Sequence, residues 1–370
     1  MPEAMPRVCI VLLNWNGWRD TIECLESLYR LEYPEFFLVV VDNGSTNDSV
    51  ERITEWVRGA RGLVPTETGI PLTVLPHDGA SSTPPPFSLS GRSGMGNHGF
   101  RPGAIFLVRS AENLGFAAGC NLGMRLGLEV GCEYVWLLNN DTVVAPDSLR
   151  KLAGFLVEHA AFAGVTGQIR LYREPHVIWN CGGSLLPLGL RRYHFCYAPA
   201  STAPQAGYAR ISFMSGCAAL LRASLMQRIG FLSEKFFHGE EDFELCQRLK
   251  RKRLALACRY DALIYHKVSA SITAAASRSV LATTHVYYLN RFIHMRVYWS
   301  AAFWQCWRYA YCPYIVWLLH RSYGTSYKAS SKMLRAVLRE SKELDRVDKA
   351  TFTRLMSEAH TRHPESVLAV

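Results

Sequence analysis

Two carboxylates, each placed directly or shortly after an apolar run, are among the residues of this sequence best suited to chemistry. Asp42 ends the run at 37–41, and Asp141 comes shortly after the run at 134–138. A carboxylate at a strand end can accept a hydrogen bond from the N–H of a nucleotide base, or bind a hard divalent cation that also holds a diphosphate. Each of the two could instead make an ordinary turn, as Asp42 would with Asn43. The residues alone leave both interpretations open.

A run of three acids, Glu240-Glu241-Asp242, stands directly before a helix expected at 243–253. The helix dipole stabilises acids at this end, but capping needs only one or two of them. Mutual repulsion raises the proton affinity of one member of such a run, as a general base requires. His266, which ends a strand-like run at 262–265, could make a structural hydrogen bond or ligate a metal.

Strands and helices alternate in the order that positions these residues together. The pattern predicts an α/β fold with a mostly parallel sheet and flanking helices. Ligands of such sheets bind at the carboxyl ends of the strands, and four of these ends carry polar runs, at 14–17, 42–45, 113–119 and 139–141. Strands are expected at 8–13, 37–41, 104–109, 134–138 and 254–265, and helices at 18–29, 49–57, 115–130, 147–159, 225–229 and 243–253, with shorter strands and loops over 165–215.

Two stretches lie outside this alternation. Residues 62–103 are rich in Pro, Gly and Ser, which predicts a long insertion that acts as a lid or partner-binding loop. The GxGxxG string at 94–99 lies inside it, without the strand and helix that a dinucleotide site needs. We therefore expect one catalytic domain over 1–275 and a helical, aromatic and basic region over 276–370.

The aromatic segment 297–320 holds four of the nine tryptophans. A membrane-spanning helix is disfavoured, because Arg308 would lie near its middle at a cost of roughly 2.5 to 3.5 kcal/mol. Two arrangements remain: a segment on an anionic membrane surface, or a helix packed on the catalytic domain. A basic amphipathic helix expected at 327–348 fits both.

Composition narrows the class of protein. The 370 residues are 49% apolar and carry a formal charge of +10, which suits a folded chain with anionic partners. No recognised nucleic-acid-binding motif is present, so nucleic acid is not expected. The eleven cysteines are scattered without a CxxC pair, and the first residues lack the pattern of a secretory signal. Together these features predict a cytoplasmic protein, and the alternative is a protein attached to the inner face of the membrane.

Taken in order, these segments resemble the inverting glycosyltransferases of family 2, which have the GT-A fold, and most nearly their rhamnosyltransferase-like branch. The matching strings include VCIVLLNWNG (8–17), VVVDNGSTNDS (39–49), ENLGFAAGCNLGM (112–124) and WLLNNDTVV (136–144). They continue with FMSGCAALL (213–221), FFHGEEDFELCQRLKRK (236–252), YDALIYHKVSAS (260–271) and YYLNR (287–291). Their order and spacing are specific for the fold and for sugar transfer.

The resemblance implies a donor site for a nucleotide diphosphate sugar. Asp42 would accept a hydrogen bond from the base, with the Asn14-Trp15 loop beside it. Other residues of the set would line the pocket near the ribose and the diphosphate. The implied donor-binding residues are Asn14, Trp15, Asp42, Asn113, Gly115, Asn121, Asn139 and Asn140.

The resemblance also implies a metal site. Asp141 matches the last carboxylate of the family's DxD motif, and His266 matches a histidine that completes the site. Asn139 replaces the first acid of that motif, which lowers the charge available to the metal. The implied cofactor is Mg²⁺ or Mn²⁺.

The remaining implied roles concern the acceptor and the transfer step. Asp242 is our choice for the catalytic base, with Glu241 second, and Met214-Ser215-Gly216 would lie near a glycan or lipid-linked acceptor. Two other functions compete with a transferase of surface-polysaccharide assembly. One is an inactive GT-A module that binds nucleotide or recruits partners. The other is a sugar nucleotidyltransferase, whose Gly-rich, Arg- or Lys-bearing phosphate loop is missing from NWNG.

Overall fold

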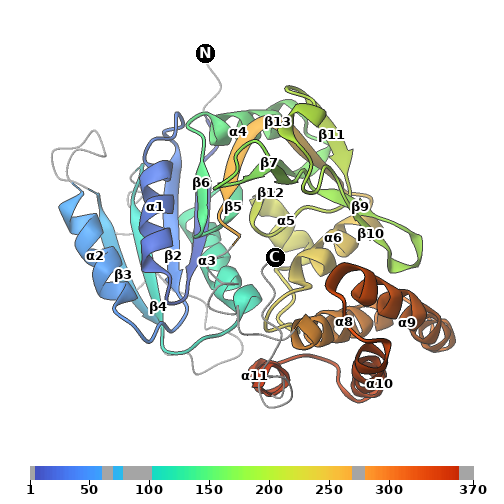
Figure 1. Cartoon of the computed structure of the whole chain (residues 1–370). Coiled ribbons are helices and arrows are strands. Elements are labelled where there is room, and N and C mark those ends of the chain that lie inside the picture. The colour runs from blue at the N-terminus through green and yellow to red at the C-terminus, as the bar shows by residue number, and fades with distance from the viewer. Residues whose placement is uncertain (1–4, 61–69, 78–101, 269–279, 358–370) are drawn as a thin grey trace.

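The computed structural model describes residues 5–60, 70–77, 102–268 and 280–357 of the 370. Most of the predicted insertion, including the GxGxxG string at 94–99, lies outside the described residues. The described part forms a large central sheet with helices on both faces and a layer of C-terminal helices at one end (Figure 1).

The central sheet has 11 strands in a mixed arrangement. Its middle is parallel: β5 (Tyr134–Asn139), β1 (Val8–Asn14), β2 (Phe36–Asp42), β4 (Ile105–Ser110) and β3 (Leu72–His77) follow one another in this order. On the other side of β5, β12 (Ala218–Arg222) runs antiparallel and joins β7 (Phe162–Leu171), β13 (Ala255–His266) and β11 (Tyr208–Ile211).

Side chains alternate between two apolar cores along the central strands, because successive residues of a strand point to opposite faces. In β1, Cys9 and Val11 enter one core, whereas Val8, Ile10 and Leu12 enter the other. The first core is covered by α3 (Phe116–Val130), α5 (Ala223–Ile229) and α6 (Glu241–Arg251), and the second by α1 (Trp18–Leu28), α2 (Ser49–Gly59) and α4 (Ser148–Glu158).

Helix α3 lies unusually close to β1 because small residues face the strand. A Cβ atom on Gly119 would approach Leu13 Cδ1 to 2.4 Å, and one on Gly123 would approach Val11 Cγ1 to 2.5 Å. Both distances are shorter than carbon–carbon contact allows, so any larger residue would push the helix away. The close packing holds the N-terminus of α3 beside the carboxyl ends of β1 and β2.

Short strands lie near one end of the sheet. Within 165–215, where they are predicted, these are β8 (Ile178–Asn180), which pairs with β7, and the hairpin of β9 (Gly183–Leu185) and β10 (Arg191–Tyr193). β6 (Thr142–Val144), which pairs with β13, is not among the predicted strands.

Strand β3 is the clearest departure from the predicted elements, because it lies inside the segment predicted to be an insertion. It pairs with β4 at the edge of the sheet. Pro76 lies within it, and proline is tolerated in an edge strand, where one row of N–H groups has no partner strand. The Pro and Gly residues around β3 are typical of loops, which is why the sequence does not predict this strand.

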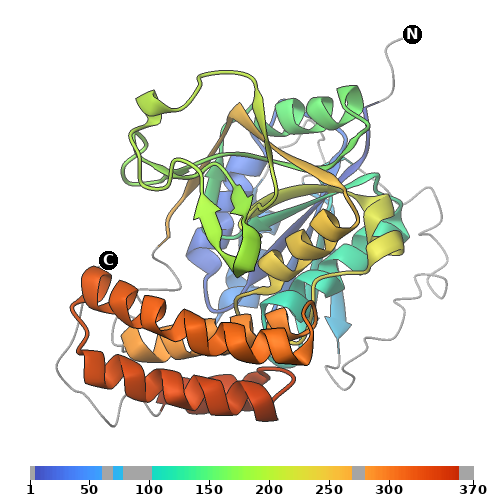
Figure 2. The same cartoon turned by 90° about the vertical axis from the view of Figure 1, so that its right-hand side faces the viewer.

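The described part of the C-terminal region, 280–357, packs as four helices around a third core: α8 (Val280–Arg296), α9 (Ala301–Tyr323), α10 (Tyr327–Glu343) and α11 (Lys349–Ser357) (Figure 2). Trp304 and Trp307 of α9 are buried in that core. Arg308 is fully buried, with Nη1 donating to Leu338 O at 2.7 Å and to Ser341 Oγ at 2.6 Å on α10. One face of α9 is thus packed. Among the described residues, no helix has the length and hydrophobicity needed to cross a bilayer.

Candidate functional site

The carboxyl ends of the strands meet at one edge of the sheet, as the sequence predicts. Asn14 and Asp42 are paired across β1 and β2, and Leu13 pairs with Asn139 of β5. Because β12 is antiparallel to β5, the segment 214–217 that precedes it reaches the same edge. His266 ends β13, which runs in the same direction as β5, and therefore arrives there too.

Asp42 is buried and bonded within its own turn. Its Oδ1 atom accepts from Asn14 Nδ2 at 2.7 Å and from Ser45 Oγ at 2.6 Å, and its Oδ2 atom accepts from the Ser45 N–H at 3.1 Å. The ordinary turn considered from the sequence is therefore present. Trp15, next to Asn14, is 53% exposed and free to contact a ligand.

A hydrogen-bond relay joins this turn to the end of β5. Asn14 Oδ1 accepts from Thr21 Oγ1 at 2.9 Å, and Thr21 Oγ1 accepts from Asn140 Nδ2 at 2.9 Å. Thr21 was not predicted, because a threonine in the first turn of a helix has no distinctive sequence signal. The relay makes Asn14 and Asn140 parts of one rigid frame.

Asp141 and His266 form a buried pair, with Oδ1 and Nε2 3.1 Å apart. Burial alone would lower the pKa of His266, but Cys217 and Asp141 outweigh it and raise that pKa to about 10. The Cys217 thiol, which the sequence did not single out, thus belongs to this cluster. Burial raises its own pKa.

The donor atoms of this pair suit a divalent ion held jointly with a diphosphate. Asp141 offers carboxylate oxygens, and His266 would offer a ring nitrogen once the incoming ion displaces its proton; Mn²⁺ accepts both, whereas Mg²⁺ prefers oxygen alone. Among the described residues, no group of three or more His, Cys, Asp or Glu side chains could hold an ion. Phosphate oxygens and water would have to supply the other ligands.

The acids 241 and 242 have unequal environments at the N-terminus of α6. Asp242 Oδ1 accepts from the Phe243 N–H at 2.7 Å, and Oδ2 accepts from the Gly216 N–H at 3.4 Å. Glu241 Oε2 is buried without a hydrogen-bond partner. Burial raises the pKa of Asp242 to about 6, whereas burial and the neighbouring charge of Asp242 raise that of Glu241 to about 8. The two backbone N–H groups bonded to Asp242 stabilise its charged form, so Asp242 ionises more readily than Glu241.

Glu240 turns away from this pair into a separate cluster. Its side chain is 1% exposed, and its carboxylate contacts Arg191 of β10 and His294 of α8. Burial alone would raise the pKa of Glu240, but these two partners lower it to about 2. Three adjacent carboxylates thus have three different proton affinities.

The segment predicted to border the acceptor supports Asp242 through its backbone. Met214 is 1% exposed and packs in the core beside Cys246, so its side chain is not available to a ligand. Ser215 Oγ accepts from the Cys217 N–H at 3.2 Å. Only Gly216, through its N–H, contacts a predicted catalytic group directly.

The loop before α3 is fixed by amide side chains. Asn43, which was not predicted, donates from Nδ2 to Asn113 Oδ1 and to Gly115 O, both at 3.1 Å. Gly115 has a φ of +87°, and a Cβ there would lie 2.5 Å from Phe237 O. Asn121 differs from its predicted position near the donor: it is 1% exposed, and its amide bonds to Leu232 and Glu234.

A series of side-chain contacts, completed by two pairs of chain neighbours (140/141 and 216/217), connects the three aspartates. Asn14, Thr21 and Asn140 lead from Asp42 to the residue before Asp141. His266 and Cys217 then lead from Asp141 to Gly216, which contacts Asp242; the series is Asp42, Asn14, Thr21, Asn140, Asp141, His266, Cys217, Gly216 and Asp242. The series places the three aspartates along one edge of the sheet, and their roles there stay a prediction.

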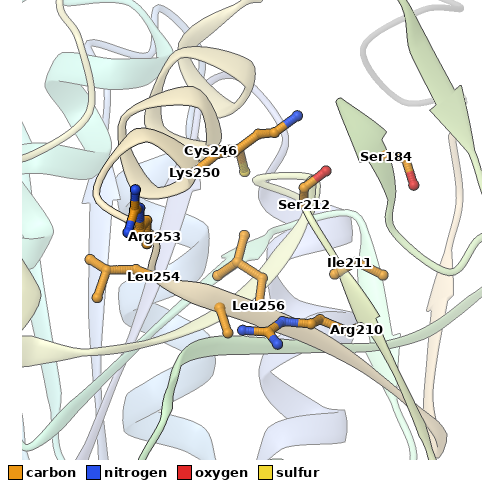
Figure 3. Close-up of a pocket in the computed structure, with 10 residues that line it drawn as sticks. Ser184, Arg210, Ile211, Ser212, Cys246, Lys250, Arg253, Leu254 and Leu256 are labelled. Atoms are coloured by element: carbon orange, nitrogen blue, oxygen red, sulfur yellow. The ribbon is translucent and has the colours of Figure 1, made fainter. Parts of the chain in front are cut away.

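A cavity of about 400 Å³ lies between the second half of α6 and the strands β9, β11 and β13 (Figure 3). Its lining includes Ser184, Ser212, Arg210, Lys250 and Arg253. Cys246, four residues after Asp242 in α6, also lines the cavity, so its lining begins about 6 Å along the helix from Asp242. None of the predicted site residues lines it.

Comparison with known proteins points to one family. Residues 101–280 match the model of a family described as glycosyltransferase like family 2. The low-salt glycan biosynthesis hexosyltransferase of Haloferax volcanii is 25% identical over 151 residues, which are 40% of this chain and 48% of that protein. The chain thus spans about half the length of this curated relative. Together the two matches support glycosyltransferase family 2.

Two solved structures resemble the whole chain. GalNAc-T7 with UDP, GalNAc and Mn²⁺ has a TM-score of 0.54 at 12% identity, covering 96% of this chain and 57% of its own. The mannosyltransferase PcManGT from Pyrobaculum calidifontis, in complex with GDP-Man and Mn²⁺, has a TM-score of 0.50 at 13% identity, covering 98% and 88%. At such identities the likeness establishes the fold alone, and that fold is GT-A, with a C-terminal helical region added.

Proposed function

We propose that this chain is an inverting glycosyltransferase that moves a sugar from a nucleotide diphosphate sugar to an acceptor hydroxyl in the assembly of a surface polysaccharide or other glycan. The observation that carries the proposal is the contact series from Asp42 to Asp242 along one sheet edge. It unites a strand-end turn, a carboxylate–histidine pair and a buried carboxylate with a raised pKa, in a chain of the GT-A fold.

The donor would lie across the carboxyl ends of β1, β2 and β5. Trp15 offers an exposed ring for a base, beside the Asp42 turn. The N-terminus of α3, held close to the sheet, favours the negative charge of a diphosphate. Asp141 and His266 would hold a Mg²⁺ or Mn²⁺ ion, which neutralises charge on the leaving diphosphate when bound.

Asp242 would remove the proton of the acceptor hydroxyl. As that oxygen bonds to the anomeric carbon, the bond from this carbon to the diphosphate oxygen breaks, and attack from the opposite face inverts the carbon. The pKa of Asp242, which burial raises to about 6, leaves the carboxylate ionised at neutral pH yet basic enough to accept a proton. Glu241, whose pKa burial and the neighbouring charge of Asp242 raise further, is the second candidate for the base.

Donor binding should be visible as thermal stabilisation that depends on a divalent ion. One cognate compound among UDP-, dTDP- and GDP-sugars, dTDP-rhamnose included, should raise the Tm by several degrees, because saturation at 100 times Kd adds about 2.7 kcal/mol. Asp141→Asn should reduce the part of the shift that needs Mn²⁺ or Mg²⁺. Nucleotide release with an acceptor separates a transferase from a binding module. No shift with any donor would contradict the proposal.

The exposed face of α9 favours attachment to an anionic membrane, where a lipid-linked acceptor would be found. Phe303, Tyr309, Tyr314 and Trp317 are each more than 40% exposed, and α9 contains no acidic residue. Aromatic side chains at a helix surface are typical of membrane-interface segments. Packing of the opposite face does not conflict with this arrangement.

Vesicle flotation tests the attachment. The chain should float with vesicles containing phosphatidylserine at low salt, and Tyr314→Glu with Trp317→Glu should lower the bound fraction at least about fivefold, because the pair removes aromatic area and adds two repelled charges. Val157→Glu, at an exposed apolar position on α4, is the matched control and should float as the parent does. Equal flotation of all three proteins would place the contact elsewhere.

A further inference from the structure

The turn that carries the proposed base is held by the C-terminal helical region. We call residues 238–242 the base turn. Asn290 of α8 is 1% exposed, and its Nδ2 group donates to His238 O at 3.0 Å and to Gly239 O at 3.1 Å. A single side chain from outside the predicted catalytic domain thus fixes two successive carbonyl groups, just before Glu241 and Asp242.

The backbone of the base turn needs such support. Gly239 has a φ of +80° and Glu240 a φ of +84°. The left-handed region suits glycine, but it costs a residue with a Cβ about 1 to 2 kcal/mol. Two consecutive residues in this conformation redirect the chain sharply into α6. External contacts must therefore stabilise the turn.

The Glu240 side chain supplies a second set of contacts. Its carboxylate accepts from His294 Nδ1 of α8 at 2.5 Å and also contacts the guanidinium group of Arg191 on β10. The side chains of Arg191, His294 and Glu240 are 7%, 3% and 1% exposed. The guanidinium carbon lies 3.5 Å from the centre of the Phe243 ring, on the first turn of α6. The cluster therefore contacts the start of α6 on both sides of Asp242, through Glu240 and Phe243.

Backbone contacts complete the support. The Phe237 N–H donates to Val347 O at 2.8 Å, between α10 and α11, and Phe237 O accepts from the Phe116 N–H of α3 at 3.0 Å. The segment before the base turn is thus bonded on one side to α3, which lies beside the proposed donor site, and on the other side to the C-terminal region. Movement of the C-terminal helices would therefore be transmitted to the base turn and to α3.

We propose that Asn290, His294 and Glu240 are positioning residues that make the C-terminal helical region part of the catalytic apparatus, by fixing the base turn and with it the carboxylate of Asp242. This inference rests on the proposed function for the role of Asp242. The proposed physical effect, immobilisation of the turn by α8, can be measured without any substrate.

Three variants test the proposal. Asn290→Ala removes the donor to the two carbonyl groups, and His294→Asn removes the partner of Glu240. His285→Asn is the matched control, since it breaks another His–Glu pair of α8, the partly buried pair with Glu340 of α10 at 2.8 Å, that does not contact the base turn. Backbone amide exchange and steady-state kinetics are measured on all three, with the Tm of each as a check of folding.

In amide exchange, Asn290→Ala and His294→Asn should accelerate exchange in a peptide covering 236–243, whereas His285→Asn should change only α8 and α10. In kinetics, the first two should lower kcat by about 10- to 100-fold at a nearly unchanged donor KM, because a displaced base slows the chemical step more than it weakens donor binding. His285→Asn should lower the Tm without that loss of kcat.

The outcomes separate this inference from the proposed function. Unchanged exchange at 236–243 in both variants would overturn the inference, whatever the activity. Faster exchange with an unchanged kcat would also overturn it, while transfer by the parent protein upheld the proposed function. If the parent transferred no sugar at all, the proposed function would fail, and the exchange result would still decide whether α8 fixes the turn.

Discussion

Asp242→Asn is expected to lower kcat by about 10²- to 10⁴-fold, the range that a general base contributes, while donor affinity changes by less than about threefold. Asparagine keeps the shape of the side chain and can still accept from the Phe243 N–H, so the turn should stay in place. It cannot accept a proton from the acceptor hydroxyl. Initial rates of nucleotide release, together with donor Kd from calorimetry, measure the two quantities separately.

The pH dependence of the parent enzyme provides a second check on the same residue. Burial raises the pKa of Asp242 to about 6, so the base becomes protonated as the pH falls through that value. Below it, kcat/KM should fall about tenfold for each pH unit. Glu241→Gln is the comparison variant, and it should retain transfer. Burial raises the pKa of Glu241 to about 8, so glutamine resembles the protonated form of this side chain. If Glu241→Gln abolished transfer and Asp242→Asn did not, the base would be Glu241.

The parallel part of the fold could be predicted from the sequence because its strands are buried on both faces. Such strands appear as continuous apolar runs, and a polar residue directly after the run marks the carboxyl end. Asp42 and Asn139 were located in this way, and the register of β1 with β2 and β5 places both at one edge. The general position of the site therefore required no knowledge of tertiary contacts.

Side chains that act through distant partners could not be found in this way. Arg191 lies 49 residues from Glu240 in the sequence, and His294 lies 54 residues from it. A lone arginine in a short strand and a histidine in a helix have no pattern that predicts this pairing. Asn121 is a related case: it lies in a string typical of donor sites, and its amide bonds to the 232–234 segment, a contact that the string does not indicate.

The packing of α9 cannot be predicted from the sequence for a similar reason. Arg308 made the segment 297–320 unsuitable for crossing a membrane, but burial of its charge depends on acceptors that only the fold supplies. Leu338 O and Ser341 Oγ, 30 and 33 residues away, are those acceptors. An arginine in an aromatic helix therefore indicates a polar partner nearby, without indicating which one.

Arg191→Met should destabilise the fold by about 3 to 5 kcal/mol, because it leaves the buried carboxylate of Glu240 without its main counter-charge. Methionine retains apolar contact with Phe243, so the loss is chiefly electrostatic. Urea denaturation followed by circular dichroism measures the free energy of unfolding. The surface pair of Arg150 with Glu32, whose side chains are 50% and 59% exposed, is the control: Arg150→Met should cost only about 0 to 1 kcal/mol.

The double variant Arg191→Met with Glu240→Gln identifies the cause of the destabilisation. Once the carboxylate is neutral, the missing guanidinium leaves no buried charge, so the double variant should be more stable than Arg191→Met alone by about 1 to 3 kcal/mol. Glutamine can still accept from His294 through its amide oxygen. If the losses of stability in the single variants Arg191→Met and Glu240→Gln simply added up in the double variant, packing around Arg191, rather than its charge, would be what stabilises the cluster at the start of α6.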